Sequence, residues 1–405
     1  MTENTVHKLT VVDAADVDAV MAALRSALAG GAALLPKDLR AVRGGSRQEI
    51  AVLAEVPTSV SVVIETSGST GTPKRVALTA EALRASGTAA FERLGGDGQW
   101  LLALPLTYIA GISVLVRSLL SGTEPVVLPA GHFDAPSFTE HVLTMTDARR
   151  YTSLVPVQLA RLVEYAEDQD QDEGESKLSA RSTIGRLDAI LIGGQALDPA
   201  LAARARALGW NVVATYGSSE TAGGCVFDGV PLDGVLVRVG DAATHEIWIT
   251  GPTLAQGYLG DDAQTTDRFV TVEGTRWYRT GDAGALTDGT LTITGRLDRV
   301  LISGGLKISL DAVEAAARTV PGCATLVAVS IPNSEWGQVP ALVVPGISPS
   351  PDRDALDDEL HDAVVAVLGR AAAPRTIHHI ERLPRLTNGK VDLLAIAQML
   401  RERDQ

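Results

Sequence analysis

Glycines and hydroxyl residues gather in residues 66–74, which read Thr-Ser-Gly-Ser-Thr-Gly-Thr-Pro-Lys. The backbone N–H groups of such a loop can together bind an anion, because glycines permit turns with positive φ. Ser67, Ser69 and Thr70 add hydroxyl donors, and Lys74 adds a positive charge. We therefore predict a polyphosphate-binding loop, although such a stretch taken alone is also typical of an ordinary surface turn.

The loop differs from a P-loop, which places four residues between a glycine and a Gly-Lys-Ser/Thr triplet. Here Gly68 and Gly71 lie too close together, and Pro73 precedes the lysine. The apolar run Val60–Ile64 before the loop predicts a buried strand. A loop at the carboxyl end of such a strand lies where α/β proteins bind ligands. The sequence therefore favours a nucleoside-triphosphate user of another type.

The strand belongs to a longer pattern, because strand-like and helix-like runs alternate from about residue 58 to 216. This alternation predicts βαβ units and a largely parallel sheet, and hence an α/β fold. The expected strands are Val60–Ile64, Leu101–Leu104, Pro125–Leu128, Thr152–Val155, Ala189–Ile192 and Val212–Thr215. The expected helices are Thr79–Leu94 with Thr79 as N-cap, Ile112–Leu120, Ser137–Met145, Val157–Glu164 and Pro199–Leu208.

Short strand-like runs between Gly/Asp turns predict a β-rich subdomain at about residues 226–297. Its expected strands are Val235–Val239, Glu246–Thr250, Arg268–Val272, Thr275–Tyr278 and Thr290–Thr294. The composition changes again near residue 298, so we predict an N-terminal domain over residues 1–297 and a small α+β domain over residues 298–405. Its expected elements are helices Leu310–Thr319, Asp354–Leu368 and Val391–Arg401 and strands Thr325–Ile331, Ala341–Val344 and Thr376–Ile380.

Composition limits the classes of function. The chain has 405 residues, 45% of them hydrophobic and 21% charged, which is typical of a globular protein. A net charge of −14 argues against a nucleic-acid partner and requires a local positive pocket for any anionic substrate. Cys225 and Cys323 give neither a disulfide framework nor a zinc spacing, which fits a cytoplasmic setting. Pro105 and Gly111 interrupt the uncharged stretch Trp100–Val116, so we expect a strand, a turn and a helix there and no membrane span.

Five further stretches could carry chemistry, and each alone is a weak signal. They are Ile192–Ala196, Tyr216–Thr221, Tyr278–Asp282, Gly295–Arg299 with the following Ser303–Lys307, and Leu386–Asp392. Their joint order and spacing leave little room for chance. Together with the loop at 66–74 they resemble the adenylate-forming superfamily of acyl- and aryl-CoA ligases, peptide-synthetase adenylation domains and luciferases. The resemblance covers roughly residues 58–395.

The resemblance implies that ATP activates a small-molecule carboxylic acid. Members of the superfamily form an acyl-adenylate and release pyrophosphate, and the ligases then pass the acyl group to the thiol of CoA. The resemblance also implies a large α/β domain with a small mobile C-terminal lid, and ATP, Mg²⁺ and CoA as ligands. It leaves the oligomeric state open, a homo-oligomer included.

Site roles are implied by matching motif positions. The residues implied to bind the nucleotide are Thr66, Ser67, Gly68, Ser69, Thr70, Gly71 and Lys74 at the phosphates, Gly194, Gln195, Ala196, Tyr216 and Gly217 around adenine, and Asp282 and Arg296 near the ribose. The other implied sites are Ser219 as a donor to the α-phosphate, Glu220 as the magnesium ligand, Tyr108, Gly193 and Ser218 in the acid pocket, Asp298 as the hinge, and Ser303, Gly304 and Gly305 in the CoA tunnel.

Lys390 is similar to the superfamily lysine that bridges the attacking carboxylate and the α-phosphate. Two anions meet in that step, and a mobile ammonium group on a separate domain stabilises the charge that develops. The same lysine must then leave so that the thiol can react, which requires the lid to rotate. Lys390 is therefore the expected catalytic lysine of the first half-reaction.

The short N-terminal region most resembles the o-succinylbenzoate–CoA ligases of menaquinone synthesis. Two positions depart from the usual pattern: Tyr108 stands in place of a histidine, and Arg75 stands in place of a glycine and is expected to face solvent. The residue that would bind the second carboxylate is not assigned.

Another acyl- or aryl-CoA ligase, or an adenylation enzyme that loads a carrier-protein thiol, remains an alternative. Intact Glu220 and Lys390 argue against a non-catalytic nucleotide-binding scaffold.

Overall fold

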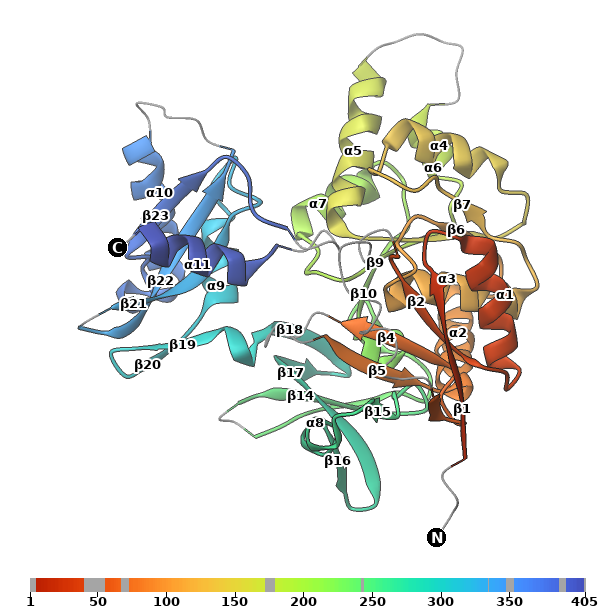
Figure 1. Cartoon of the computed structure of the whole chain (residues 1–405). Coiled ribbons are helices and arrows are strands. Elements are labelled where there is room, and N and C mark those ends of the chain that lie inside the picture. The colour runs from red at the N-terminus through yellow and green to blue at the C-terminus, as the bar shows by residue number, and fades with distance from the viewer. Residues whose placement is uncertain are drawn as a thin grey trace. The chain divides into compact units, whose positions relative to one another are not determined.

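The structure is a computed structural model that describes residues 5–39, 55–66, 73–171, 179–241, 244–333, 335–346, 353–385 and 391–403 (Figure 1). The chain forms two compact units. Unit 1 comprises Met1–Arg238, Trp248–Arg279 and Thr287–Leu291, and unit 2 comprises Val239–Ile247, Thr280–Leu286 and Thr292–Gln405.

The first sheet of unit 1 has the strand order β15-β5-β4-β2-β1-β3. Its strands are β1 (Val6–Asp13), β2 (Ala33–Lys37), β3 (Glu55–Pro57), β4 (Val62–Thr66), β5 (Lys74–Leu78) and β15 (Gly257–Tyr258). Strand β4 is parallel to β2 and antiparallel to β5, with Thr66 opposite Lys74. The predicted phosphate loop therefore connects the two strands of a hairpin. The sequence predicts β4 but misses β5, which stands between the loop and the next helix.

The second sheet of unit 1 has the strand order β12-β11-β10-β9-β8-β6-β7. Its strands are β6 (Gln99–Leu102), β7 (Val126–Val127), β8 (Arg150–Leu154), β9 (Ala189–Ile192), β10 (Val212–Ser218), β11 (Gly223–Phe227) and β12 (Val230–Pro231). The run from β7 to β10 is parallel, and β11 and β12 continue antiparallel at one edge. The predicted α/β class is confirmed, and the other edge strand of this sheet, β7, is parallel to its neighbour β6.

Within the described ranges of unit 1, seven helices join or cover these strands. They are α1 (Val17–Leu28), α2 (Ala80–Leu94), α3 (Ile109–Ser121), α4 (Ala135–Thr144), α5 (Pro156–Gln171), α6 (Ala180–Ile184) and α7 (Pro199–Ala207). Helix α2 begins as predicted, because Thr79 Oγ1 accepts a hydrogen bond from Ala82 N at 3.1 Å. Phe138, Leu159 and Ile184 pack from α4, α5 and α6 into one buried apolar cluster that also holds residues of β8 and β9.

A third sheet has the order β13-β14-β17-β16, with β18 paired to β17. Its elements are β13 (Leu236–Val239), β14 (Glu246–Thr250), β16 (Phe269–Val272), β17 (Thr275–Thr287) and β18 (Thr290–Arg296), with the short helix α8 (Asp262–Arg268) before β16. The predicted β-rich region is present, and β17 continues well beyond the predicted Thr275–Tyr278.

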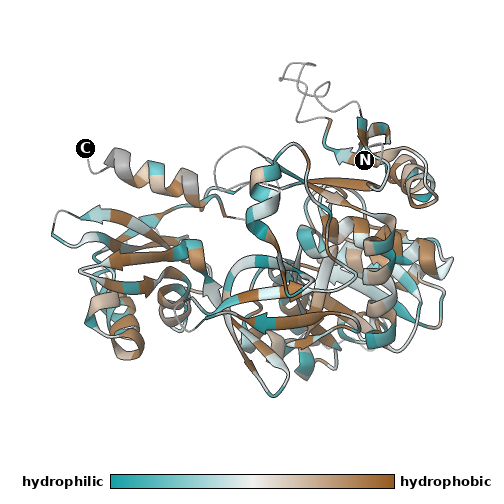
Figure 2. Cartoon of the chain, turned by 90° about the horizontal axis from the view of Figure 1, so that it is seen from below, coloured by the Kyte–Doolittle hydropathy of each residue, from teal (hydrophilic) through white to brown (hydrophobic). Residues whose placement is uncertain are grey.

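The main sheet of unit 2 has the order β20-β19-β22-β21, with β23 parallel to β22. Its elements are β19 (Val300–Ser303), β20 (Leu306–Ser309), α9 (Leu310–Ala317), β21 (Val327–Asn333), β22 (Gly337–Pro345), α10 (Arg353–Leu368), β23 (Thr376–Ile380) and α11 (Leu393–Arg403). Alternate residues of a strand point to opposite faces. Thus Val327 and Val329 pack in the cluster that contains Ile396 of α11, and Ala328 packs in the cluster of α9 and α10. Figure 2 shows the hydrophobic residues of these strands in brown.

No helix among the described residues is long and apolar enough to cross a bilayer. The uncharged stretch Trp100–Val116 forms the end of β6, a turn and the start of α3, as predicted. The domain boundary between residues 297 and 298 stays a prediction.

Candidate active site

The base of the predicted phosphate loop is fixed by the β4–β5 hairpin. Thr66 and Lys74 face each other across it, and Glu65 faces Arg75 in the next pair. Ser67, Ser69, Thr70 and both loop glycines, Gly68 and Gly71, lie outside the described residues. The structure thus describes both ends of the predicted loop.

Glu65 forms two ion pairs at the base of the predicted loop. Its Oε1 lies 3.0 Å from Arg75 Nε, and its Oε2 lies 3.2 Å from Lys37 Nζ of the neighbouring strand β2. The expectation that Arg75 faces solvent is wrong, because only 26% of its side chain is exposed. The hairpin places Glu65 directly opposite Arg75, and this cross-strand partner is what holds the guanidinium.

The residues implied to surround adenine lie at the carboxyl ends of β9 and β10. Gly193, Gly194, Gln195 and Ala196 follow β9, and Gly194 adopts a positive φ of 81°. Gly217 lies opposite β11 at a shift in strand register. A Cβ atom there would lie 2.1 Å from Gly223 O, so the close approach of the two strands requires glycine.

Tyr216 and Ser218 are half-buried on β10, and Ser219 and Glu220 are buried in the short 3-10 helix η3 (Ser219–Thr221) that follows. Ser218 N donates a 2.9 Å hydrogen bond to Thr221 Oγ1, which fixes this turn. Tyr108 is half-buried at the N-cap of α3 and makes no side-chain capping hydrogen bond there.

Glu220 has a defined neutral partner. Its Oε1 accepts a 2.9 Å hydrogen bond from the hydroxyl of Tyr258 on β15. Lys74 Nζ lies 5.7 Å from the centroid of the same tyrosine ring, within cation–π range. Unit 1 thus brings the last residue of the phosphate loop and the predicted metal ligand to one aromatic side chain.

Burial, followed by the negative charge of Glu220, raises the pKa of Tyr258 well above its usual range. The phenol therefore keeps its proton at neutral pH and acts as the hydrogen-bond donor. This neutral partner brings no positive charge to Glu220, and the described residues form no ion pair with it.

A divalent cation fits this carboxylate. Magnesium prefers oxygen ligands and is commonly held by one or two carboxylates together with substrate phosphates. The described residues contain no cluster of three or more His, Cys, Asp or Glu side chains that could hold a metal by themselves. Glu220 shares the neighbour Tyr258 with Lys74 and has no ion-pair partner among the described residues, so it is the kind of single ligand that such a shared site uses.

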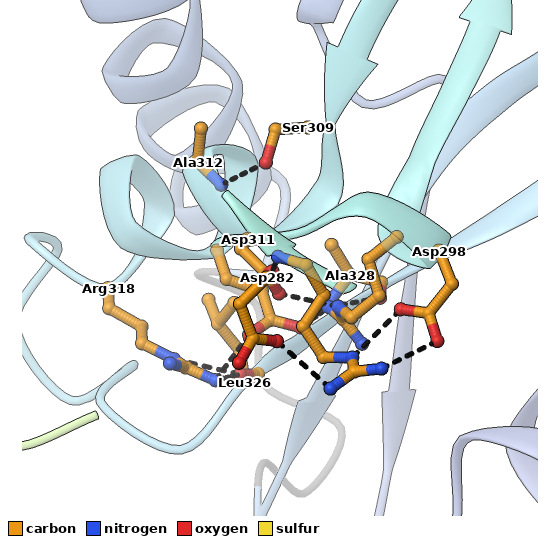
Figure 3. Close-up of polar contacts among 11 residues, drawn as sticks. Asp282, Asp298, Ser309, Asp311, Ala312, Arg318, Leu326 and Ala328 are labelled. Atoms are coloured by element: carbon orange, nitrogen blue, oxygen red, sulfur yellow. Dashed lines mark hydrogen bonds and ion pairs between the residues drawn. The ribbon is translucent and has the colours of Figure 1, made fainter. Parts of the chain in front are cut away.

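In unit 2, three predicted residues form one polar network (Figure 3). Arg296 Nη1 donates to Asp282 Oδ1 at 3.0 Å, while Nε and Nη2 form a bidentate pair with Asp298 at 2.9 and 3.0 Å. Asp282 itself is held by its backbone N–H, which donates to Thr280 Oγ1 at 3.0 Å. The predicted ribose carboxylate and the predicted hinge carboxylate therefore share one guanidinium.

The chain beside this network is tied to helix α9. Arg296 N donates to Asp311 Oδ2 at 2.7 Å, and the side chain of Arg299 pairs with Asp311 and with the buried Glu314. Arg318 also donates to Glu314, at 2.8 Å. The segment after the predicted hinge is thus joined to α9 by several charged contacts.

Ser303, Gly304 and Gly305 lie in the β19–β20 hairpin, with Ser303 buried at the end of β19. Gly304 has a φ of 54°, and a Cβ atom there would lie 2.4 Å from the ring of Trp336. The predicted assignment of this turn to the CoA tunnel stays a prediction. Lys390 lies outside the described residues, so its assignment also stays a prediction.

Sequence reasoning missed two contacts near the predicted site. One joins Tyr258 to Glu220, and the other joins Lys37 to Glu65. Tyr258 is separated from Glu220 by 38 positions, and Lys37 lies 28 positions before Glu65. No local pattern reveals either contact. The signal that could have found them is strand pairing, because β15 and β2 are both strands of the sheet that carries β4 and β5.

Comparisons with known proteins bear on the family and the fold of the chain. The sequence profile described as AMP-binding enzyme matches residues 7–259, and the profile of the AMP-binding enzyme C-terminal domain matches residues 312–390. A probable 2-succinylbenzoate–CoA ligase of Mycobacterium tuberculosis is 38% identical over 398 residues, covering 93% of this chain and 98% of the relative. The 2-succinylbenzoate–CoA ligase of Escherichia coli is 30% identical over 347 residues, covering 83% of this chain and 68% of the relative.

Solved structures share the fold. A variant of E. coli MenE with bound OSB-AMS is 26% identical with a TM-score of 0.66, covering 85% of this chain and 70% of that chain. The Bacillus subtilis o-succinylbenzoate CoA synthetase with the acyl-adenylate intermediate OSB-AMP has a TM-score of 0.72 over 97% of this chain and 82% of that chain; at 22% identity it shows the fold alone. The resemblance to adenylate-forming enzymes is confirmed: the chain belongs to the AMP-binding enzyme family.

Proposed function

We propose that this chain is an AMP-forming acid–CoA ligase whose acid is o-succinylbenzoate, as in menaquinone biosynthesis. The observation that carries the proposal is the 38% identity to the M. tuberculosis 2-succinylbenzoate–CoA ligase across 93% of the chain. The matches of the two AMP-binding enzyme profiles to residues 7–259 and 312–390 support it. The residue that binds the second carboxylate of the acid is left unassigned.

The reaction has two steps that share one site. A carboxylate oxygen attacks the α-phosphorus of ATP, the bond to the bridging oxygen breaks, and pyrophosphate leaves with its electron pair. The CoA thiol, losing its proton, then attacks the acyl carbon, and AMP leaves. Each step needs its reacting atoms held in line and its developing negative charge stabilised.

Most of the nucleotide contacts in this proposal come from residues 66–74 and 194–220. The loop after β4 binds the β- and γ-phosphates, with Lys74 at its far end. Ser219 donates to the α-phosphate, and Tyr216 lies against adenine. Glu220 holds Mg²⁺, which when bound neutralises phosphate charge. Tyr108 lines the acid pocket and can stack on an aromatic ring.

Residues after position 280 have the remaining roles. Asp282 accepts hydrogen bonds from the ribose hydroxyls, and Arg296 lies near the ribose and phosphate. Lys390 stabilises the first transition state by its charge. Asp298 acts as the hinge about which the lid rotates between the two steps, and Ser303, Gly304 and Gly305 line the CoA tunnel. A cytoplasmic location stays a prediction from cysteine usage.

A substrate panel tests the proposal. The full-length protein is incubated with ATP, Mg²⁺, CoA and one acid at a time, including o-succinylbenzoate, benzoate and short- and medium-chain fatty acids. Thioester products are measured by mass spectrometry. We expect o-succinylbenzoyl-CoA to form with the highest kcat/KM. A higher kcat/KM for another acid would refute the substrate, and acyl-AMP that never reacts with CoA would refute the acceptor and favour a carrier protein.

A further inference from the structure

Tyr258 is the one hydrogen-bond partner that the described structure gives to the Glu220 carboxylate, and no motif role is assigned to it. The hydroxyl donates to Oε1 at 2.9 Å, and both side chains are buried. A fixed donor on one oxygen of a carboxylate sets the direction in which the other oxygen points. Partners that orient a metal ligand in this way contribute to the affinity of many metal sites.

We propose that Tyr258 is a positioning residue for the metal site: it holds the Glu220 carboxylate in the orientation in which its free oxygen receives the divalent cation that accompanies ATP. This rests on the proposed function, in which Glu220 is the metal ligand. Tyr258 does not touch the substrate in this role; it acts through Glu220.

Tyr258 is itself held firmly enough to do this. Its strand β15 pairs with β5, with Tyr258 opposite Val76 (Figure 1). Its backbone N–H donates to Thr265 Oγ1 at 2.9 Å, and its ring lies edge-on to Phe269 with 5.8 Å between centroids. Tyr278 on β17 adds a hydrogen bond to the phenol.

The backbone connects the same two regions. Ala255 N donates to the carbonyl oxygen of Glu220 at 2.8 Å. Arg276 fixes the segment before β15, because its guanidinium donates to Ala255 O and Gln256 O at 2.9 and 2.7 Å. Glu220 is therefore joined to the chain around Tyr258 through both its backbone and its side chain, which limits relative motion of the two.

The same ring also contacts the end of the phosphate loop. Lys74 Nζ lies 5.7 Å from its centroid. A single side chain thus touches the metal ligand with its hydroxyl and the loop lysine with its face. Glu220 would contact the phosphates through a metal, and Lys74 would contact them directly. Tyr258 thus gives both groups a common rigid support.

The neutrality of the donor matters. A lysine or arginine in place of Tyr258 would compensate the Glu220 charge and compete with the cation. The hydroxyl of Tyr258 orients the carboxylate and brings no positive charge of its own. Tyrosine also reaches Glu220 from a separate strand without a mobile aliphatic chain, since its side chain has only two rotatable bonds.

The test uses Tyr258→Phe, which removes the hydroxyl and keeps the ring. Binding of Mn²⁺ to the protein with a non-hydrolysable ATP analogue is followed by electron paramagnetic resonance. We expect about tenfold weaker Mn²⁺ binding in Tyr258→Phe, the lower end of the effect of removing such a partner. In acyl-AMP formation the half-saturating Mg²⁺ concentration should rise by a similar factor, with a smaller loss of kcat at saturating Mg²⁺.

Tyr151→Phe is the matched control. Tyr151 is also buried, and its hydroxyl donates to the carbonyl oxygens of Leu94 and Gly96 at 3.3 and 3.1 Å. This variant loses a buried phenol hydroxyl without touching the site, so it should keep wild-type Mn²⁺ binding. If Tyr258→Phe does not fold, Tyr278→Phe replaces it, with about threefold weaker binding expected from losing one hydrogen bond to Tyr258.

Glu220→Gln separates this inference from the proposed function. If Glu220→Gln weakens Mn²⁺ binding and Tyr258→Phe does not, the inference alone is overturned. If Glu220→Gln has no effect, both the metal assignment and the inference fail. In the double variant, Tyr258→Phe should add nothing to Glu220→Gln, and an additive loss would contradict action through Glu220. A wild type that makes no acyl-AMP while Tyr258→Phe still weakens Mn²⁺ binding would refute the proposed function and support the inference.

Discussion

Two carboxylates assigned to the nucleotide are held in opposite ways. Glu220 in unit 1 is buried and accepts a hydrogen bond from a neutral phenol, and within the described ranges it forms no ion pair. Asp282 in unit 2 is paired with Arg296 at 3.0 Å, and Arg296 is also paired with Asp298. The first carboxylate has a neutral partner, and the second has a cationic one.

The difference fits the two proposed ligands. A metal ion needs an anionic oxygen, so a neutral partner is suitable for Glu220. Ribose hydroxyls are neutral donors, and a carboxylate already neutralised by arginine can accept hydrogen bonds from them without leaving an uncompensated charge in the site. The partner of a carboxylate can therefore indicate whether its ligand is a cation or a hydroxyl group.

We expect the largest loss of activity from a residue other than these two carboxylates. The two carboxylates hold the nucleotide in this proposal, whereas Lys390 is assigned to the charge that develops between the attacking carboxylate and the α-phosphate. Lys390→Ala should slow acyl-AMP formation by about 10²–10³, the scale of losing one electrostatic stabiliser. Transfer to CoA from preformed acyl-AMP should change far less. Rapid-quench measurement of the two half-reactions checks this, and an equal loss in both would remove the role given to Lys390.

Asp282→Asn sharpens the comparison with an effect of about tenfold on the KM for ATP, the scale of one charge-assisted hydrogen bond. Because Asp282 is assigned to hydroxyls, the half-saturating Mg²⁺ concentration should stay at the wild-type value. With 2′-deoxy-ATP the difference between variant and wild type should shrink, since part of the lost contact is already absent. A variant that instead needs more Mg²⁺ would break the distinction between the two carboxylates.

The smallest expected effect concerns a buried group that neither site uses. Burial raises the pKa of Cys225 to about 12. The unfolded chain loses this proton at a lower pH than the folded chain, so the thiol favours folding below its unfolded pKa, and this contribution is lost as pH rises towards 12. We expect the thermal stability of Cys225→Ala to fall less steeply than that of wild type between about pH 9 and 11. Scanning calorimetry measures this, and parallel curves would contradict it. Activity at neutral pH should remain near wild type.

Much of the fold follows from local sequence. The Thr79 cap of α2, strand β9 (Ala189–Ile192) and strand β23 (Thr376–Ile380) are all present as predicted. These elements have apolar runs or capping residues whose effect acts within a few positions. The short strand β5 was missed because it begins with Lys74 and Arg75, which are not typical of a buried strand.

The site residues also differ in whether a local motif or distant strand pairing determines them. Motif order predicts Glu220, Asp282 and Arg296, and the structure shows the latter two in contact. The contact between Tyr258 and Glu220 depends on how β15 adds to the first sheet, which no periodicity in the sequence reports. The expectation for Arg75 failed for the same reason, because hairpin register decided its partner.

The central claim is that this chain joins a carboxylic acid to AMP before any thiol reacts. Exchange of radiolabelled pyrophosphate into ATP, measured without CoA, tests it most directly. We expect exchange that requires both Mg²⁺ and o-succinylbenzoate. The absence of exchange with every acid of the panel, or release of ADP and phosphate in place of pyrophosphate, would contradict it.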